Sequence, residues 1–223
     1  MASRDPWLLE EQLEELLGGT GLLAALLIIK QVGHHALRDT LKLTGWDQPP
    51  PESFFKALTE TTAEHATDAA TRYVANIAPL VVSAANKPYF QDALIAARMS
   101  EIRTPEGRTT TLSLLAELVN AAGRFAGRFT TPVPVADLML ELVAPRPGET
   151  IYDPCFGFGG FLLGAARRIS ATTGTDPSPT RADRGRIVGV EVDREAYAVG
   201  LCRTLLAGIQ HARLELGDAL HRP

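Results

Sequence analysis

Residues 153–161 read Asp-Pro-Cys-Phe-Gly-Phe-Gly-Gly-Phe, and this run constrains the fold more than any other part of the chain. A short apolar stretch at 150–152 precedes it and a helical pattern at 160–169 follows it, which predicts a strand, a glycine loop and a helix. Such a unit presents backbone amides and a helix N-terminus to a nucleotide-like ligand. The third glycine of a dinucleotide fingerprint would fall at Leu162, so the pattern disfavours a pyrophosphate site.

The region after the loop continues the same alternation. Further short strands are predicted at 187–190 and 213–216, with a helix at about 194–207 between them. Strands that alternate with helices predict a parallel sheet with crossover connections. Residues 170–186 are rich in Thr, Pro, Asp, Gly and Arg and have no periodicity, so we expect a surface loop there.

A helix is also predicted just before the loop. Thr131-Pro132 is typical of an N-cap followed by a first helical residue, and apolar residues then recur at helical spacing as far as Pro145–Gly148. The change in character after Gly127 places a domain boundary at residues 125 and 126.

Residues 1–125 are predicted to be helical throughout. Asp5-Pro6 can begin a first helix, Gly18-Gly19 can end it, and Thr20 can cap a second helix that runs towards Leu41. Trp46–Pro51 is expected to be a connection. Further helices are predicted at about 53–84, 91–100 and 112–125, with a turn at Thr104–Gly107. The fold class is therefore a helical N-terminal module, 1–125, followed by an α/β domain, 126–223.

Composition excludes few functions. The chain has 45% hydrophobic and 22% charged residues, which is ordinary for a soluble protein. Its longest apolar stretch, 21–29, ends at Lys30 and is shorter than the roughly 20 residues that a membrane helix needs. No leader pattern is present, so we expect a cytoplasmic protein without a membrane contact. The formal net charge of -4 lends no support to DNA binding, which needs clustered basic residues.

No metal site is expected. Cys155 and Cys202 are the only cysteines, and we interpret both as free thiols. His34 and His35 are adjacent within a helical pattern, so their side chains project about 100° apart and cannot readily share a metal ion.

The glycine loop resembles the cofactor loop of the modification subunits of type I restriction systems and related N6-adenine DNA methyltransferases, which typically reads Asp-Pro-Ala-Cys-Gly-Thr-Gly-Gly-Phe. The acidic residue, the proline and the three glycines correspond, and the matching cofactor-binding positions are Asp153, Gly157, Gly159 and Gly160. The resemblance implies a Rossmann-like domain that binds S-adenosyl-L-methionine.

Three positions of the loop depart from the family pattern. Cys155, Phe156 and Phe158 stand where the family has Ala, Cys and Thr. Both phenylalanines are bulky, so we expect them to repack the loop or to narrow the pocket for the methionine portion.

Three other segments resemble family elements and occur in the family's order. Upstream, Phe129, Thr131 and Pro132 match a Phe-x-Thr-Pro element, which by resemblance lies at the methionine end of the cofactor, where a helix N-terminus favours its carboxylate. Downstream, Glu191 ends the second strand, where a carboxylate can accept hydrogen bonds from both ribose hydroxyls. Asp218 belongs to a Gly-Asp-small-Leu element and would accept from the adenine amino group.

The resemblance implies an adenine-specific DNA methyltransferase of a restriction-modification system, with DNA as substrate and with specificity and restriction subunits as partners. No catalytic residue is assigned. In the family an Asn-Pro-Pro-aromatic motif after the fourth strand holds the flipped base, and no Asn-Pro-Pro occurs in this sequence. The resemblance also implies more strands than the three expected here. We therefore interpret the chain as a fragment, or as one half of an enzyme whose C-terminal half another chain supplies.

Other interpretations stay open at this point. The cofactor half is shared by methyltransferases that act on RNA or protein, and a non-catalytic remnant could retain it. A glycine loop alone also suits a nicotinamide or flavin site, or a structural turn. Glu191 alone could be a solvated strand end, and Asp218 could simply cap a turn.

Overall fold

The computed structural model describes residues 6–32, 52–60, 68–125, 130–173, 187–209 and 211–221. The chain divides into two compact units, Met1–Arg128 and Phe129–Pro223. None of the described helices is long and apolar enough to span a membrane. Expectations for 33–51, for 174–186 and for Phe129, including the two histidines, lie outside the described residues.

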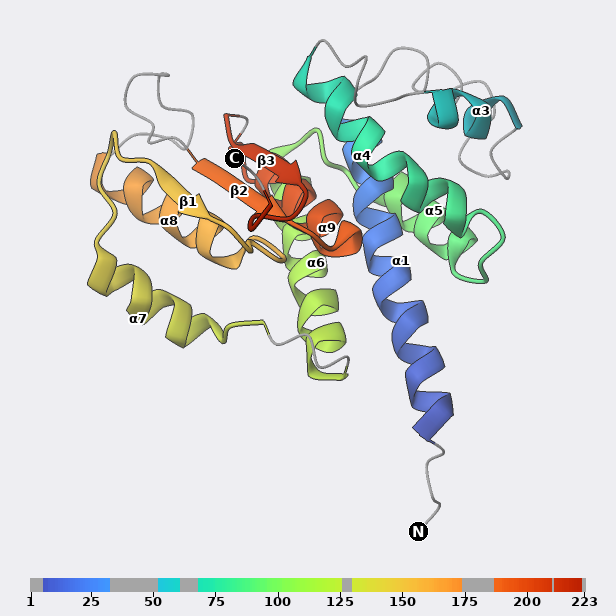
Figure 1. Cartoon of the computed structure of the whole chain (residues 1–223), viewed down its shortest axis with the longest axis horizontal. Helices are drawn as coiled ribbons and strands as arrows, with labels where there is room; N and C mark the ends of the chain where they lie inside the picture. Colours follow the sequence, from blue (N-terminus) through green and yellow to red (C-terminus); the bar gives the residue numbers. More distant parts are fainter. Residues whose placement is uncertain are drawn as a thin grey trace. The chain divides into compact units, whose positions relative to one another are not determined.

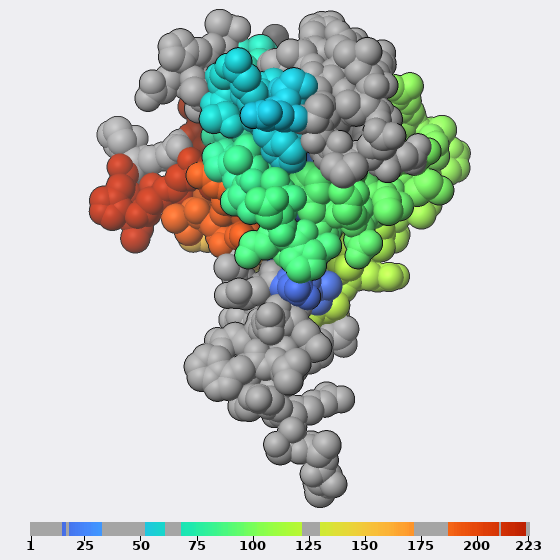
Figure 2. All heavy atoms as spheres, turned by 90° about the vertical axis from the view of Figure 1, so that its right-hand side faces the viewer, coloured from blue at the N-terminus to red at the C-terminus, as the bar shows by residue number. Residues whose placement is uncertain are grey.

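The described part of the first unit is helical (Figure 1). Its helices are α1 (Pro6–Val32), α3 (Glu52–Glu60), α4 (Ala69–Ala84), α5 (Phe90–Met99) and α6 (Pro105–Phe125). Helix α1 packs against α4, α5 and α6. Helix α3 packs against α4, and its cyan surface adjoins the green surface in Figure 2. Residues 22–29 of α1 are apolar on all sides and each is at most 4% exposed, so this stretch is the centre of the core.

Helix α1 corrects the prediction that Gly18-Gly19 ends a helix. The helix runs through both glycines, and the hydroxyl of Thr20 donates to the carbonyl of Leu16 at 2.7 Å instead of capping a new helix. A Cβ on Gly18 would lie 2.5 Å from the Tyr89 hydroxyl oxygen, and one on Gly19 would lie 3.7 Å from the Tyr89 Cβ. The two glycines therefore make room for Tyr89, which packs against the helix at this point.

Two further expectations in this unit were wrong. The predicted helix at 53–84 is two helices, because Asp68 caps α4 by accepting from the Thr71 amide at 2.9 Å and from its hydroxyl at 2.8 Å. The predicted turn at 104–107 is the beginning of α6, where the Gly107 amide donates to the Thr104 hydroxyl at 3.0 Å. The predicted helix at 91–100 is confirmed as α5.

Lys30 carries a prediction about stability. Its ammonium donates to the carbonyls of Ala97, Arg98 and Ser100 at 3.0, 3.0 and 2.8 Å and so caps the end of α5. We expect Lys30→Met to lower the free energy of unfolding by about 1.5–3 kcal/mol, because charged hydrogen bonds to carbonyls are lost and those carbonyls are left unsatisfied. Chemical denaturation measures this change.

The matched control for that variant is Lys56→Met. Lys56 pairs with Glu60 at 3.9 Å and its side chain is 74% exposed, so its removal should change stability by less than about 1 kcal/mol. Equal effects of the two substitutions would contradict the capping role of Lys30.

The second unit is an α/β layer (Figure 1). Its elements are α7 (Val133–Val143), β1 (Ile151–Asp153), α8 (Gly160–Thr173), β2 (Ile187–Glu191), α9 (Arg194–Leu206) and β3 (Arg213–Leu216). The strands are parallel in the order β1-β2-β3, with Asp153 opposite Gly189 and Glu191 opposite Leu216. The predicted alternation and parallel sheet are confirmed for the described strands.

Two boundaries in this unit differ from the prediction. Helix α8 continues to Thr173, so residues 170–173 are helical and not part of a loop. Helix α7 begins after Pro132, which takes the N-cap position with a ψ of 138°, so Thr131 is not the N-cap. No side chain caps this helix; the Pro132 carbonyl accepts from the amides of Val135 and Ala136 instead.

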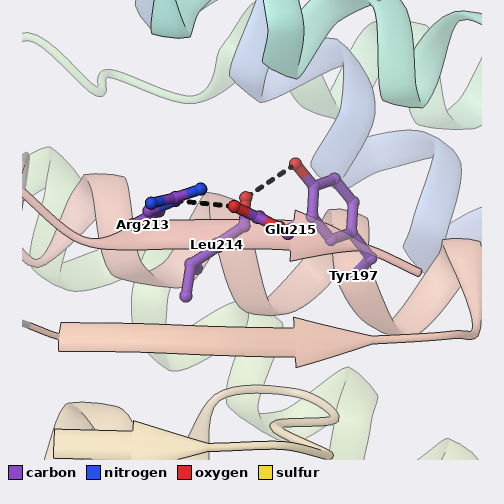
Figure 3. Close-up of polar contacts among 4 residues, drawn as sticks. All are labelled: Tyr197, Arg213, Leu214 and Glu215. Atoms are coloured by element: carbon purple, nitrogen blue, oxygen red, sulfur yellow. Dashed lines mark hydrogen bonds and ion pairs between the residues drawn. The ribbon is translucent and has the colours of Figure 1, made fainter. Parts of the chain in front are cut away.

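The core of this unit lies between α9 and the sheet. Tyr197 of α9 is fully buried, and its hydroxyl lies 3.5 Å from the carbonyl of Leu214 in β3 (Figure 3). On the exposed side of β3, Arg213 and Glu215 pair at 2.6 Å. Helix α7 packs against α8, where Gly164 leaves room for Leu140.

Candidate cofactor-binding site

The glycine loop connects β1 to α8 and folds over the end of β2. Gly157 and Gly159 have φ of 54° and 79°, a left-handed conformation that other residues adopt only with strain. The Gly159 amide donates to the Phe156 carbonyl at 2.8 Å, and the Phe156 amide donates to the Val190 carbonyl at 3.2 Å. The loop is therefore a tight turn that is hydrogen-bonded to the neighbouring strand.

The loop also approaches α9 closely. A Cβ on Gly159 would lie 3.5 Å from the Cα and from the carbonyl oxygen of Gly200. By contrast, a Cβ on Gly160, the first residue of α8, would meet nothing within 4 Å. The loop thus packs on α9 at Gly159, while the N-terminal turn of α8 at Gly160 has free space around it.

Glu191 lies at the end of β2 and joins three segments. One carboxylate oxygen accepts from the Gly157 amide at 2.7 Å, and the other accepts from the Asp193 amide at 2.8 Å. The Glu191 carbonyl accepts from the Gly217 amide at 2.8 Å, just after β3. Glu191 is only 8% exposed, so it is not the solvated strand end that the sequence also allowed. Each carboxylate oxygen can still accept a second hydrogen bond.

Asp153 stands at the end of β1, next to β2. One of its carboxylate oxygens accepts from the Cys155 amide at 3.1 Å. Burial raises the pKa of Asp153, the nearby charge of Glu191 raises it further, and the Cys155 hydrogen bond partly opposes the rise. Two carboxylates thus share the same end of the sheet, at an unfavourable electrostatic cost.

This cost predicts a pH-dependent effect of Asp153→Asn. Because folding raises the pKa of Asp153, the protonated carboxyl favours the folded state. This stabilisation is complete below the pKa of the unfolded chain, about 3.9, and is lost as the pH rises through the pKa of the folded chain. We therefore expect the Asn variant to melt at a higher temperature than the unchanged chain at pH 7, and the two melting temperatures to converge as the pH falls towards 4. A pH series of thermal melts measures this, and a lower melting temperature of the variant at pH 7 would contradict it.

Asp218 follows β3 and is exposed. Its carboxylate accepts from the Leu220 amide at 2.9 Å and lies 2.5 Å from Nδ1 of His221. These two contacts, the Leu220 amide first, lower the pKa of Asp218 and keep it ionised. Asp218 shapes the turn after β3, as the simpler interpretation held, and it also presents an ionised acceptor there.

The structure brings together only part of the predicted set. Asp153, Gly157, Gly159 and Glu191 belong to one hydrogen-bonded and packed cluster, to which Gly217 links the β3 end. Gly160 follows this cluster in sequence, at the exposed start of α8. Thr131 and Pro132 are exposed at the start of α7, and no hydrogen bond between described residues joins them to the loop.

Phe156 is buried beneath the loop. The residue is 3% exposed, and its ring lies against the positions of Gly189 and Gly200. Phe156 therefore fills the space between β2 and α9, and the expected repacking of the loop or narrowing of the pocket stays a prediction. Phe158 is half-buried, and its carbonyl accepts from the Arg203 guanidinium at 2.6 Å.

Sequence reasoning missed Arg203 and Gly200, which both support the loop from α9. The small residues at 189 and 200 were the available signal, because an inserted Phe156 needs space that only small neighbours leave. The cysteines are free thiols as expected, with Cys155 exposed and Cys202 buried, and burial raises the pKa of the Cys202 thiol. Among the described residues, no cluster of three or more His, Cys, Asp or Glu side chains could hold a metal ion.

Comparison with known proteins identifies the family of the α/β unit. The N-6 DNA Methylase family model matches residues 113–223, about half of the chain and all of the α/β unit. The Type II restriction enzyme and methyltransferase RM.BcgI of Heyndrickxia coagulans is 24% identical over 123 residues, which are 54% of this chain and 19% of that protein. The HindI methylase subunit of a Type I restriction enzyme from Haemophilus influenzae is 35% identical over 60 residues, 27% of this chain and 13% of that subunit.

Solved structures agree in fold. A chain of a type I R-M system, studied for its complex assembly and conformational transition, superposes with a TM-score of 0.64 at 19% identity, covering 94% of this chain and 47% of that chain. This chain therefore spans about half the length of that structure and a fifth or less of the two curated relatives. Residues 113–223 of this chain, which carry the glycine loop and Glu191, belong to the N-6 DNA Methylase family.

Proposed function

We propose that the chain is the S-adenosyl-L-methionine-binding part of an adenine-specific DNA methyltransferase of a restriction-modification system. The observation that carries the proposal is the cluster at the carboxyl ends of the strands, where the Gly157 amide lies 2.7 Å from the Glu191 carboxylate. Ligands of open α/β sheets bind at this end of the strands. Family membership and the methylase relatives support the choice of ligand.

Each residue of the cluster has a role in this proposal. Glu191 accepts hydrogen bonds from the two ribose hydroxyls, and Asp218 accepts from the adenine amino group. Gly157, Gly159 and Gly160 allow the backbone and the N-terminus of α8 to approach the methionine portion, and Asp153 holds the loop through Cys155. In this proposal, the methionine end of the ligand is also bound by Phe129, Thr131 and Pro132. The bound cofactor supplies an electrophilic methyl group; these residues bind and orient it.

In this proposal, residues 126–223 are the first part of a Rossmann-like domain. Residues 1–125 form a helical module that contacts DNA or a specificity subunit. Within the described residues β1 pairs only with β2, and Tyr152 on it is 56% exposed. Helix α7 shows an apolar surface in which the following side chains are 46–77% exposed: Val133, Val135, Leu138, Met139, Leu142 and Val143. Exposed apolar surfaces of this extent and open strand edges are each normally covered.

We propose that another part of the enzyme covers β1 and α7. It contains the remaining strands and the group that holds the target adenine. Transfer to an exocyclic amine needs that amine aligned with the methyl group and hydrogen-bonded to an acceptor. The solved relative has about as much chain again as the part matched here. Restriction and specificity subunits are further proposed partners.

A panel of ligands tests the cofactor assignment. We expect S-adenosyl-L-methionine and S-adenosyl-L-homocysteine to raise the melting temperature of the full chain. At a hundredfold excess of ligand over its dissociation constant, the free energy of unfolding should rise by about 2.7 kcal/mol. NAD and FAD serve as the dinucleotide controls and should have no effect. Stabilisation by a dinucleotide alone would replace the proposal with an oxidoreductase or flavin site.

A transfer assay tests the substrate. With methyl-labelled cofactor and adenine-containing duplex DNA, the 223-residue chain alone should transfer no label, and a mixture with the C-terminal half of a related type I methylase subunit should label adenine. Labelling of DNA by the chain alone would contradict the division of the site. Labelling of RNA or protein, and not DNA, in the mixture would contradict the proposed substrate.

A further inference from the structure

The loop is held in place by two contacts that flank Gly157. On one side the buried ring of Phe156 fills the space next to Gly189 and Gly200, and on the other side Arg203 donates to the Phe158 carbonyl at 2.6 Å. Between them the Gly157 amide points at Glu191. We propose that Phe156 and Arg203 are positioning residues that set the separation between the glycine loop and Glu191, and so let one ligand reach both. This inference rests on the proposed cofactor.

The fit of Phe156 is close on three sides. A Cβ on Gly189 would lie 2.6 Å from Cδ1 of Phe156, and a Cβ on Gly200 would lie 2.6 Å from its Cε2. The ring of Tyr197 lies 6.1 Å away, centroid to centroid, at 52°. An aromatic ring enclosed by two strictly small positions and another ring has little freedom to shift. The backbone of residue 156 is therefore fixed relative to both β2 and α9.

Arg203 supports the same loop, although burial of its guanidinium costs stability. Its Nε is buried and makes no hydrogen bond to the described residues, while its Nη1 bonds the Phe158 carbonyl. Burial lowers the pKa of Arg203, and the nearby charge of Arg167 lowers it further. A partly buried guanidinium held against a backbone carbonyl costs stability, which is typical of residues kept for a site.

Phe156 and Arg203 both act on the distance between Gly157 and Glu191. Glu191 is held by the Asp193 amide and by the Gly217 amide at its own carbonyl, independently of the loop. The loop, by contrast, is placed by residues 156 and 158. Loss of either anchor would let Gly157 move away from Glu191 without unfolding the strand ends. A ligand that bridges loop and carboxylate would lose more affinity than one that uses the carboxylate alone.

The test compares S-adenosyl-L-methionine, which spans both groups, with adenosine, which lacks the methionine portion. Both ligands are titrated calorimetrically into the full chain and into Phe156→Leu and Arg203→Met variants, at a temperature where all are folded. We expect each variant to raise the dissociation constant of S-adenosyl-L-methionine about tenfold or more and that of adenosine less than about threefold, because small misplacement of a bridging site is costly. Leu206→Ala, buried on the last turn of α9, is the control and should leave the ratio of the two constants unchanged.

A double substitution separates positioning from general destabilisation. A Cβ at position 189 would lie 2.6 Å from the Phe156 ring, 3.0 Å from Leu214 and 3.2 Å from Leu162. Gly189→Ala should therefore raise the ratio of the S-adenosyl-L-methionine dissociation constant to that of adenosine. In the Phe156→Leu background, where the closest contact is relieved, it should raise that ratio less. If the original chain binds S-adenosyl-L-methionine and the ratio of the two dissociation constants is the same in Phe156→Leu and Arg203→Met, the inference is overturned and the proposed function stays intact. Failure of the unchanged chain to bind S-adenosyl-L-methionine would overturn both.

Discussion

Replacing Glu191 with Gln is expected to weaken binding of S-adenosyl-L-methionine by about 100-fold, the equivalent of roughly 3 kcal/mol. The amide is nearly the same size as the carboxylate, but its nitrogen cannot accept a hydrogen bond. Both carboxylate oxygens accept from backbone amides, at 2.7 and 2.8 Å, so either orientation of the Gln side chain sets an N–H against an N–H. The variant thus loses the charge that favours the ribose hydroxyls and one of the two backbone ties, to Gly157 or to Asp193. Calorimetric titration measures the change.

The control for this substitution is Glu141→Gln on α7. Its side chain is 72% exposed and lies 3.8 Å from Arg168, so it should bind the cofactor as the unchanged chain does. Circular dichroism of both variants establishes that the sheet remains. Equal dissociation constants for Glu191→Gln and the unchanged chain would show that Glu191 serves only the loop.

Gly107→Ala is expected to be the most damaging substitution in the helical unit, lowering its stability by more than about 3 kcal/mol. A Cβ at this position would lie 1.8 Å from the Glu101 carbonyl oxygen and 2.6 Å from its carbon, and backbone cannot yield as a side chain can. The first turn of α6 would have to move away from residues 101–104, and the bond from Gly107 to Thr104 would be lost.

Thermal denaturation measures this effect, and about 3 kcal/mol corresponds to a fall of roughly 6–12 °C for a chain of this size. Gly160→Ala is the matched control, since a Cβ there meets nothing within 4 Å at the beginning of α8. It should change stability by less than about 1 kcal/mol. A Gly107→Ala protein as stable as Gly160→Ala would contradict the close approach of α6 to Glu101.

The alternation of strands and helices in the α/β unit could be predicted from local sequence, whereas several helix boundaries in both units were missed. Strand β2 begins where its apolar run begins, and β3 shows the alternation of polar and apolar residues that predicts a strand buried on one face. Gly18-Gly19 looked like a helix end because the residue that they accommodate, Tyr89, is distant in sequence. Asp68 was different: an Asp three residues before Thr71 is a capping signal that could have been recognised.

The site divides in the same way. Glu191 and Asp153 were predictable because the end of a strand in a parallel sheet determines where a carboxylate lies. The burial of Phe156 and the contact of Arg203 with the loop depend on how α9 packs, and periodicity in α9 does not reveal which of its residues meets the loop. The sequence carried only an indirect sign, the glycines at 189 and 200.

Whether this chain holds the methyl donor can be measured by isothermal titration of the full chain with S-adenosyl-L-methionine in the absence of DNA. We expect saturable binding of one S-adenosyl-L-methionine per chain, competed by S-adenosyl-L-homocysteine and weakened about 100-fold by Glu191→Gln. No saturable binding at millimolar cofactor, from a chain shown to be folded, would contradict it.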